Sequence, residues 1–178
     1  LDTMSFGVDP AAALARLRPP VVAAVSGRCH SVGLELALAA DIRLATTDAT
    51  FALADAGAGR LACWGGTQRL PRTIGPARAA AVVLLGLILT ADEAGPGLVT
   101  EVVESLVVAT DAVVGQLLAV APLAVELAKE AVHRGAELPL RDGLRLEGDL
   151  NHLLAVTQDR AEGLAAFFAK RPPDFAGR

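Results

Sequence analysis

Two acidic residues, Glu35 and Asp55, stand in otherwise apolar surroundings. Glu35 lies within the apolar segment of residues 32–38, and Asp55 directly follows Phe-Ala-Leu-Ala at residues 51–54. Acidic side chains are almost never buried without a partner, so each must be paired, solvated in a cleft, or functional. Because carboxylates in unusual surroundings cluster at functional sites, both are candidate catalytic residues. The structural alternatives are an acid paired with an arginine for Glu35 and a turn residue for Asp55.

The tripeptide of residues 31–33, Ser-Val-Gly, precedes Glu35 at the expected start of a helix. Free N–H groups at a helix start, together with the helix dipole, can stabilise a developing oxyanion. Every helix start offers such groups, so this position alone does not identify a site. The neighbouring Cys29 and His30 could be read as a nucleophile and its base. Adjacent residues of an extended segment point to opposite faces, however, which argues against that pairing.

The sequence offers little for other kinds of chemistry. Three scattered histidines and two distant cysteines give no metal-ligand spacing, and we expect no metal site. Gly65 and Gly66 do not complete a phosphate-loop or dinucleotide-binding fingerprint, and the neighbouring Trp64 is expected to pack or line a pocket wall. A formal charge of −4 and a pI near 5.3 argue against a general nucleic-acid binder, which would need a basic face.

Length and composition describe an ordinary globular domain. With 178 residues, 53% of them apolar and 20% charged, the chain can bury a substantial core and is not expected to be disordered. A long uncharged run, residues 79–91, has 13 residues. A membrane span needs roughly 20 residues, so we expect no membrane partner. Two cysteines without a secretory segment predict a reducing, cytoplasmic location.

Strands alternate with helices in the first part of the chain, and helices alone follow. This order predicts an α/β fold with a helical C-terminal region, which we divide into residues 1–104 and 105–178. The expected strands are residues 21–25, 41–45, 50–53 and 98–103. The expected helices are residues 9–17, 33–40, 67–74, 77–85, 106–120, 123–134, 140–155 and 159–170, with a loop at 57–66. The spacing of Asp159 and Glu162 predicts a capping box at the last helix.

Several motifs, taken together and in order, resemble the crotonase family, also called the enoyl-CoA hydratase/isomerase superfamily. The most recognisable is Gly-Gly-Thr-Gln-Arg-Leu-Pro-Arg at residues 65–72. The amino-acid sequence around residues 41–45 and 170–173 is similar to that of methylglutaconyl-CoA hydratase-like members. The matching segments run through nearly the whole chain: residues 20–27, 33–45, 65–75, 89–94, 97–99, 159–163 and 167–173.

The resemblance implies a crotonase-like spiral of strand-strand-helix units and C-terminal helices that assemble homotrimers or hexamers. It also implies an acyl-CoA thioester as substrate, with no separate cofactor. Glu35 and Asp55 occupy the positions of two catalytic acids that flank a water and the thioester in the family's hydratases. Val32 would supply a backbone N–H of the oxyanion hole. Phe167 and Lys170 match C-terminal positions that contact the CoA nucleotide, commonly across a subunit boundary.

Within the candidate site, the sequence departs from the family's pattern at three points. Ser31 and Val32 replace glycines, which puts a branched side chain near the ligand and makes a positive φ costly there. Asp55 replaces a glutamate, which retracts the carboxylate by about 1.5 Å. Residues 61–64, Leu-Ala-Cys-Trp, make a bulkier pocket wall than the family's proline- and glycine-rich segment.

A larger departure concerns the beginning of the chain. Residues 1–4 resemble the segment that immediately follows the family's Ala-Gly-x-Asp motif, which supplies the first oxyanion N–H. We therefore expect the N-terminal strands to be absent from this chain and a sheet edge to lie open.

These observations leave three functions open. The favoured one is an enoyl-CoA hydratase-type lyase of fatty-acid or branched-chain acyl-CoA metabolism, with Glu35 activating water and Asp55 handling the α-proton, or with the two roles shared or reversed. The second is an isomerase or hydrolase of the same fold that acts on the same thioester. The third is a catalytically degenerate subunit that binds acyl-CoA or a partner without turnover, as the lost glycines would favour. Fold resemblance alone does not choose among them.

Overall fold

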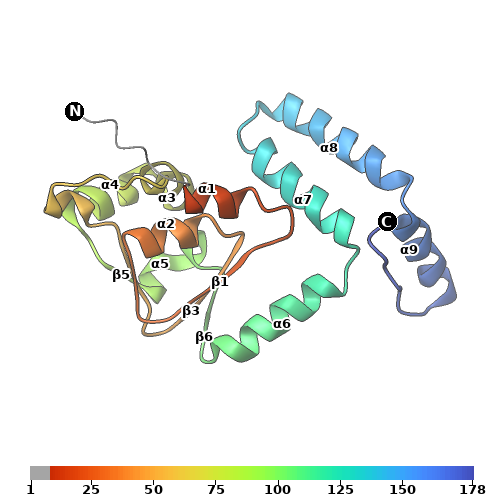
Figure 1. Cartoon of the computed structure of the whole chain (residues 1–178), viewed down its shortest axis with the longest axis horizontal. Coiled ribbons are helices and arrows are strands. Elements are labelled where there is room, and N and C mark those ends of the chain that lie inside the picture. The colour runs from red at the N-terminus through yellow and green to blue at the C-terminus, as the bar shows by residue number, and fades with distance from the viewer. Residues whose placement is uncertain (1–8) are drawn as a thin grey trace. The chain divides into compact units, whose positions relative to one another are not determined.

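The computed structural model describes residues 9–178, so the features expected of residues 1–4 lie outside the described residues. The described chain forms two compact units. The first contains the residues up to Leu17 and then Val21–Thr110, and the second contains Arg18–Pro20 and Asp111–Arg178. The strands belong to the first unit, coloured red to green in Figure 1, and the second unit is helical. The division expected after residue 104 lies slightly earlier along the chain.

Two small sheets organise the first unit. Strands β1 (Val22–Val25), β3 (Ile42–Thr46) and β6 (Glu101–Val103) form a parallel sheet in the order β1-β3-β6. Strands β2 (Arg28–His30), β4 (Thr50–Ala52) and β5 (Leu89–Thr90) form the other, in which β2 and β4 are parallel and β4 and β5 antiparallel. Together with the surrounding helices they make a mixed α/β fold, as predicted.

The helices of the first unit begin and end at recognisable signals. Asp9 caps the first helix by accepting a hydrogen bond from the Ala12 N–H at 3.0 Å. Thr90 and Glu93 form a capping box, and Gly86, at φ 67°, ends another helix in the left-handed conformation. These elements are α1 (Pro10–Ala15), α2 (Val32–Leu38), the 3-10 helix η1 (Asp55–Ala58), α3 (Gly66–Ile74), α4 (Pro76–Leu85) and α5 (Ala91–Leu98).

Four helices complete the chain: α6 (Leu106–Leu118), α7 (Pro122–Gly135), α8 (Leu140–Ala155) and α9 (Gln158–Ala169). The predicted bounds of α8 are confirmed, and those of the other three agree within two residues. Across residues 9–178 no single helix is long and apolar enough to cross a membrane. Helices α6 and α7 pass that test only as a pair, which bends by 105° at its break.

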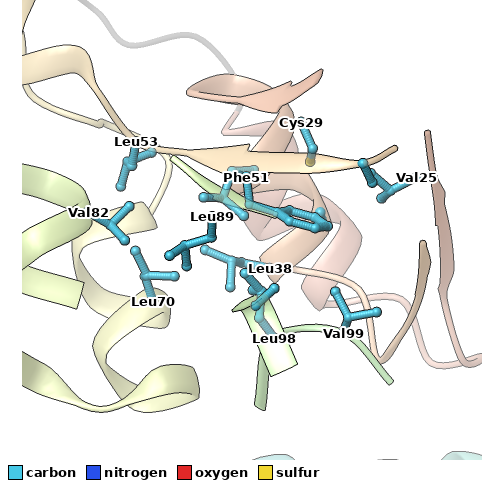
Figure 2. Close-up of a cluster of buried hydrophobic side chains, with 14 of the residues drawn as sticks. Val25, Cys29, Leu38, Phe51, Leu53, Leu70, Val82, Leu89, Leu98 and Val99 are labelled. Carbon is cyan, nitrogen blue, oxygen red and sulfur yellow. The ribbon is translucent and has the colours of Figure 1, made fainter. Parts of the chain in front are cut away.

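The core of the first unit gathers side chains from almost every element around Phe51. Cys29 from β2, Leu38 from α2, Leu70 from α3 and Leu98 from α5 all contribute to it (Figure 2). Complete burial of one such leucine or phenylalanine contributes about 1.5 to 3 kcal/mol. This packing fixes α2 and α3 against the β2–β4 sheet, and these are the elements that carry the candidate site.

The structure corrects several element predictions. Strands β2 and β5 were not predicted, and residues 91–98 form α5 where only a strand from residue 98 was expected. Gly95 has a φ of 63° within α5, so the helix consists of two short turns joined at a kink. The loop expected at residues 57–66 is partly helical, because η1 covers its beginning and α3 its last residue.

The capping box predicted at Asp159 is wrong. Helix α9 is capped two residues earlier by Thr157, whose side chain accepts the Arg160 N–H at 3.2 Å. Asp159 is buried and instead accepts the N–H groups of Ala176 and Gly177, at 2.7 and 2.9 Å. Threonine and aspartate can both cap a helix, so the sequence does not distinguish residue 157 from residue 159. In the structure Asp159 binds the C-terminal tail, which leaves Thr157 as the cap.

Candidate active site

Glu35 and Asp55 both follow the carboxyl ends of paired strands. Strands β2 and β4 run parallel with His30 aligned to Ala52, and Glu35 then lies in α2 while Asp55 begins η1. The carboxyl ends of adjacent parallel strands meet at one edge of a sheet, where ligands of α/β folds commonly bind. The fold therefore brings both predicted acids to the same end of this sheet. Across residues 9–178 no hydrogen bond joins the two carboxylates.

Glu35 is held by backbone groups rather than by a charged partner. Its side chain is only 2% exposed, and its Oε1 accepts the N–H groups of Trp64 and Gly66 at 2.7 and 2.9 Å. No hydrogen bond from the described part of the chain reaches Oε2. The alternative of an arginine-paired acid is therefore wrong. Because both donors face Oε1, a proton taken up by Glu35 would be carried by Oε2.

Gly66 makes this close approach possible. A Cβ atom at this position would lie 3.0 Å from Glu35 Cγ, 3.1 Å from Glu35 Oε1 and 2.9 Å from Leu53 Cδ2. Those distances leave no room for a side chain unless the carboxylate moves. The preceding Gly65 has a φ of 90° and caps α3. The role of Gly66 was not predicted from the sequence, although the pair of adjacent glycines was a signal that could have indicated it.

Asp55 also has one oxygen held and one without a partner. Its Oδ1 lies 3.4 Å from Arg60 Nη2, and its side chain is 12% exposed. Its Oδ2 is buried, and no group among the described residues hydrogen-bonds to it. Arg60 is itself 70% exposed, and ion pairs with such exposed partners contribute about 0 to 1 kcal/mol. A buried carboxylate oxygen with no partner is uncommon, and a proton-transfer role is one explanation. The alternative of a turn residue fits the backbone of Asp55, which begins the 3-10 helix η1, but it does not account for the buried side chain.

Ser31 and Val32 begin α2 beside the end of β4. The Ser31 N–H donates to the Ala52 carbonyl at 2.8 Å, and Ser31 has a φ of 48° and a ψ of −115°. That conformation favours glycine, so the backbone strain expected where glycines are replaced occurs at Ser31. Val32 is the first helical residue, and its side chain is 43% exposed. Its N–H belongs to the first turn, where no carbonyl within the helix can accept it.

Cys29 and His30 do not form a nucleophile–base pair. Burial raises the pKa of the Cys29 thiol to about 11, so that it is protonated at neutral pH. His30 points to the other face of β2, as predicted, where its Nε2 lies 3.1 Å from Thr50 Oγ1. Burial, and secondarily the Arg28 charge, lowers the pKa of His30. Within residues 9–178 no three His, Cys, Asp or Glu side chains gather in a way that could hold a metal ion.

Phe167 and Lys170 lie at the end of α9, in the second unit. Phe167 and Phe168 are 77% and 79% exposed, and their rings meet edge to face at 5.7 Å between centroids. Lys170 caps the helix with a φ of 51°. Exposed aromatic rings and a lysine at the same helix end are groups that can contact a planar, phosphate-bearing ligand.

After these residues the C-terminal tail folds back on α9. Arg171 makes two hydrogen bonds to Glu162, at 2.6 and 2.8 Å, and the Asp174 N–H adds another at 2.8 Å. Arg171, followed by the Asp174 N–H, lowers the pKa of Glu162 to about 2. Sequence reasoning did not anticipate this arrangement.

Comparison with known proteins identifies the family. The family model described as enoyl-CoA hydratase/isomerase matches residues 6–178. The 2,3-dehydroadipyl-CoA hydratase of Escherichia coli is 40% identical over 170 residues, which cover 94% of this chain and 67% of that protein. The human mitochondrial enoyl-CoA hydratase domain-containing protein 2 is 38% identical, over 93% of this chain and 59% of that protein. The chain belongs to the enoyl-CoA hydratase/isomerase family, and the predicted resemblance is confirmed.

Solved structures agree on the fold. An enoyl-CoA hydratase from Bacillus anthracis matches with a TM-score of 0.91 at 37% identity, over 94% of this chain and 66% of that one. An enoyl-CoA hydratase subunit from Geobacillus kaustophilus matches with a TM-score of 0.89 at 38% identity. The crotonase-like fold is thus confirmed. The chain spans about two thirds of the length of the relatives it matches.

Proposed function

We propose that this chain acts as an enoyl-CoA hydratase-type lyase, adding water to a trans-2-enoyl-CoA thioester of fatty-acid or branched-chain acyl-CoA metabolism. The observation that carries the proposal is the arrangement at Glu35, where two backbone N–H groups fix Oε1 and leave Oε2 for proton transfer. Membership of the family supports it, as do relatives named as hydratases, including a crotonyl-CoA hydratase at 37% identity.

The reaction needs a base at Cβ and an acid at Cα. Oε2 of Glu35 takes a proton from water while the water oxygen bonds to Cβ. The electrons of the double bond move onto the thioester oxygen as an enolate. Oδ2 of Asp55 then gives a proton to Cα, and the thioester carbonyl re-forms. The cycle therefore starts with Glu35 ionised and Asp55 protonated on Oδ2. One O–H bond of water, the O–H bond of Asp55 and the C=C π bond break, while an O–H bond on Glu35, one C–O bond and one C–H bond form. Proton exchange with solvent then returns both acids to their starting states.

The enolate requires hydrogen-bond donors at the thioester oxygen. The Val32 N–H, at the start of α2, is the proposed donor in this chain, supported by the dipole of the helix. Removing one such donor typically costs about 3 kcal/mol of barrier. The reaction as written uses the CoA thioester as substrate and requires no metal or redox cofactor. We propose Phe167 and Lys170 as contacts for the CoA nucleotide, supplied within a homotrimer or hexamer.

The test is to add a short trans-2-enoyl-CoA to the purified chain and follow the loss of absorbance of the conjugated thioester. We expect turnover that falls at least about a hundredfold in Glu35→Gln, which keeps the shape of the side chain but cannot act as the base. Glu101→Gln, on an exposed position of β6, is the matched control and should retain activity. Migration of the double bond without water uptake would indicate an isomerase, and release of free CoA would indicate a hydrolase.

A second candidate function has its own supporting observation. The strained Ser31 and the exposed Val32 side chain stand where the family has glycines, which favours a subunit that binds acyl-CoA without turning it over. Binding of the enoyl-CoA measured by calorimetry, with no change in absorbance and no effect of Glu35→Gln, would support this candidate over the hydratase.

A further inference from the structure

Arg69, in the first turn of α3, contacts the segment of residues 64–66 that binds Glu35. The segment presents two N–H groups to the carboxylate and two carbonyl groups to Arg69. The Trp64 carbonyl accepts the guanidinium Nη1 at 2.7 Å, and the Gly65 carbonyl accepts the Arg69 backbone N–H at 2.8 Å. Arg69 and Glu35 therefore hold the same short segment through opposite sets of backbone groups.

Peptide planarity couples these contacts. The Gly65 carbonyl and the Gly66 N–H belong to one rigid peptide group, which the backbone N–H groups of Gln68 and Arg69 hold at one end and Glu35 holds at the other. The peptide that joins Trp64 to Gly65 lies between the two N–H donors, and the guanidinium fixes its carbonyl. Rotation of the Gly65–Gly66 peptide would turn the Gly66 N–H away from Oε1, and a shift of the Trp64–Gly65 peptide would move the two donor-bearing peptides that it joins.

The guanidinium also lies directly against Gly65. A Cβ atom at Gly65 would be 2.5 Å from Arg69 Nη1 and 3.2 Å from its Cζ. The Thr73 hydroxyl donates to the Arg69 carbonyl at 2.8 Å, which adds a further tie within α3. A half-buried, planar side chain thus covers the one residue of the segment whose φ of 90° makes it the most easily rearranged.

We infer that Arg69 is a positioning residue for the reaction, which acts through the Trp64–Gly66 backbone to keep Oε1 of Glu35 fixed and Oε2 aimed at water. This role rests on the proposed function of Glu35. Without the guanidinium, the Trp64–Gly65 peptide loses its side-chain hydrogen bond and its cover, so the segment that carries the two donors is held only by its backbone contacts and by Glu35. A displacement of about 1 Å in a catalytic group can cost roughly a hundredfold in rate.

The experiment separates kcat from KM in two variants. Arg69→Met keeps an unbranched, apolar stem and removes every side-chain donor but not the backbone N–H, and we expect kcat to fall about ten- to a hundredfold with KM within about threefold. Arg69→Lys retains one donor that can reach the Trp64 carbonyl, so its kcat should lie between those of Arg69→Met and the unsubstituted chain. Arg72→Met is the matched control, because Arg72 is exposed on the same helix and bonds to the Gln68 carbonyl.

The outcomes separate this role from the proposed function. Turnover by the unsubstituted chain, together with an unchanged kcat in Arg69→Met, would overturn the role of Arg69 and leave the function of Glu35 standing. No turnover in the unsubstituted chain would overturn both. Equal loss in Arg69→Met and Arg69→Lys, with KM rising as much as kcat falls and a lowered thermal midpoint, would show a purely structural contribution and overturn the inference.

Discussion

At Glu35, the donors that hold the carboxylate are parts of the main chain. The N–H groups of Trp64 and Gly66 have no rotamers to lose, whereas an arginine would have to order a long side chain to make the same contacts. A backbone donor also cannot change rotamer and bind the substrate in place of Glu35. Oε1 is therefore fixed by the course of the chain at the start of α3, and the absence of a side chain at Gly66 is a condition for this geometry.

Gly66→Ala tests that condition. Its methyl group would meet Glu35 and Leu53 at about 3 Å, so we expect a loss of about 1 to 3 kcal/mol in the free energy of unfolding. Displacement of the carboxylate should lower kcat at the same time. Urea denaturation and the absorbance assay measure the two effects. Gly57→Ala is the control, since no atom lies within 4 Å of a Cβ there. Equal stability of the two variants would contradict the crowding at Gly66.

Ser31 offers a prediction of opposite sign. At a φ of 48° and a ψ of −115°, a residue with a Cβ atom is strained by about 1 to 3 kcal/mol. Glycine relieves this strain but loses about 0.5 to 1 kcal/mol through the greater freedom of the unfolded chain. Ser31→Gly should therefore raise the free energy of unfolding by about 1 kcal/mol in urea denaturation. Ser26→Gly, at an exposed serine without a positive φ, should lower it.

Among the elements, those with a long periodic pattern could be predicted from sequence. Residues 140–155 form α8 as expected, because 16 residues of amphipathic helix carry a strong signal. Strand β2 could not be found in this way. Its three residues, Arg28–His30, have no distinctive pattern and become a strand only by pairing with β4. Helix α5 was hidden by Gly95 and Pro96, which are normally signs of a helix end.

The candidate site likewise contains residues that could be predicted from the sequence and residues that could not. Glu35 and Asp55 were accessible to sequence reasoning, because an acid among apolar residues is unusual whatever the fold. The donors at Trp64 and Gly66 were not, since every residue other than proline has the same N–H and only tertiary structure aims it. The partnerless Oδ2 of Asp55 likewise depends on what surrounds η1.

The C-terminal tail should respond to acid through Glu162. Its pKa falls from 4.5 to about 2 when Arg171 and the Asp174 N–H bind it. Because the folded pKa lies below the unfolded one, this contribution is present above about pH 4.5 and is lost as pH falls towards 2. Hydrogen exchange of residues 171–178, corrected for the intrinsic effect of pH, should show release across that window.

Two variants define the cause of that release. Glu162→Gln removes the charge that Arg171 binds, so its tail should exchange rapidly even at neutral pH. Glu130→Gln removes the charge from an exposed pair with Arg134 on α7 and should leave tail exchange unchanged. Continued protection of the tail in Glu162→Gln would show that the contacts of Asp159 are sufficient to hold it.

For the whole molecule, the two units differ in how much apolar surface they bury. The first has a core built around Phe51. In the second, Leu150 and Ala166 are the buried apolar residues of the range 111–178, all of which the structure describes. Most of the large exposed apolar side chains lie on helices α6 to α9. Ordering a residue costs about 1 to 2 kcal/mol in backbone entropy, and the burial of these two apolar side chains does not offset that cost over the residues of four helices. These helices therefore need an additional apolar surface to pack against.

We expect other copies of the same chain to supply that surface, in the trimer or hexamer that the resemblance implies. Sedimentation velocity and light scattering at micromolar concentration should then give a multiple of 18.2 kDa. Leu144 and Leu153, on α8, are 56% and 60% exposed, and replacing both with glutamate should dissociate the assembly because charges would be buried without partners. Leu84→Glu, at a 72% exposed position of α4, should leave the mass unchanged. A stable monomer that unfolds cooperatively would contradict this prediction, because it would show that the second unit is stable without an additional apolar surface.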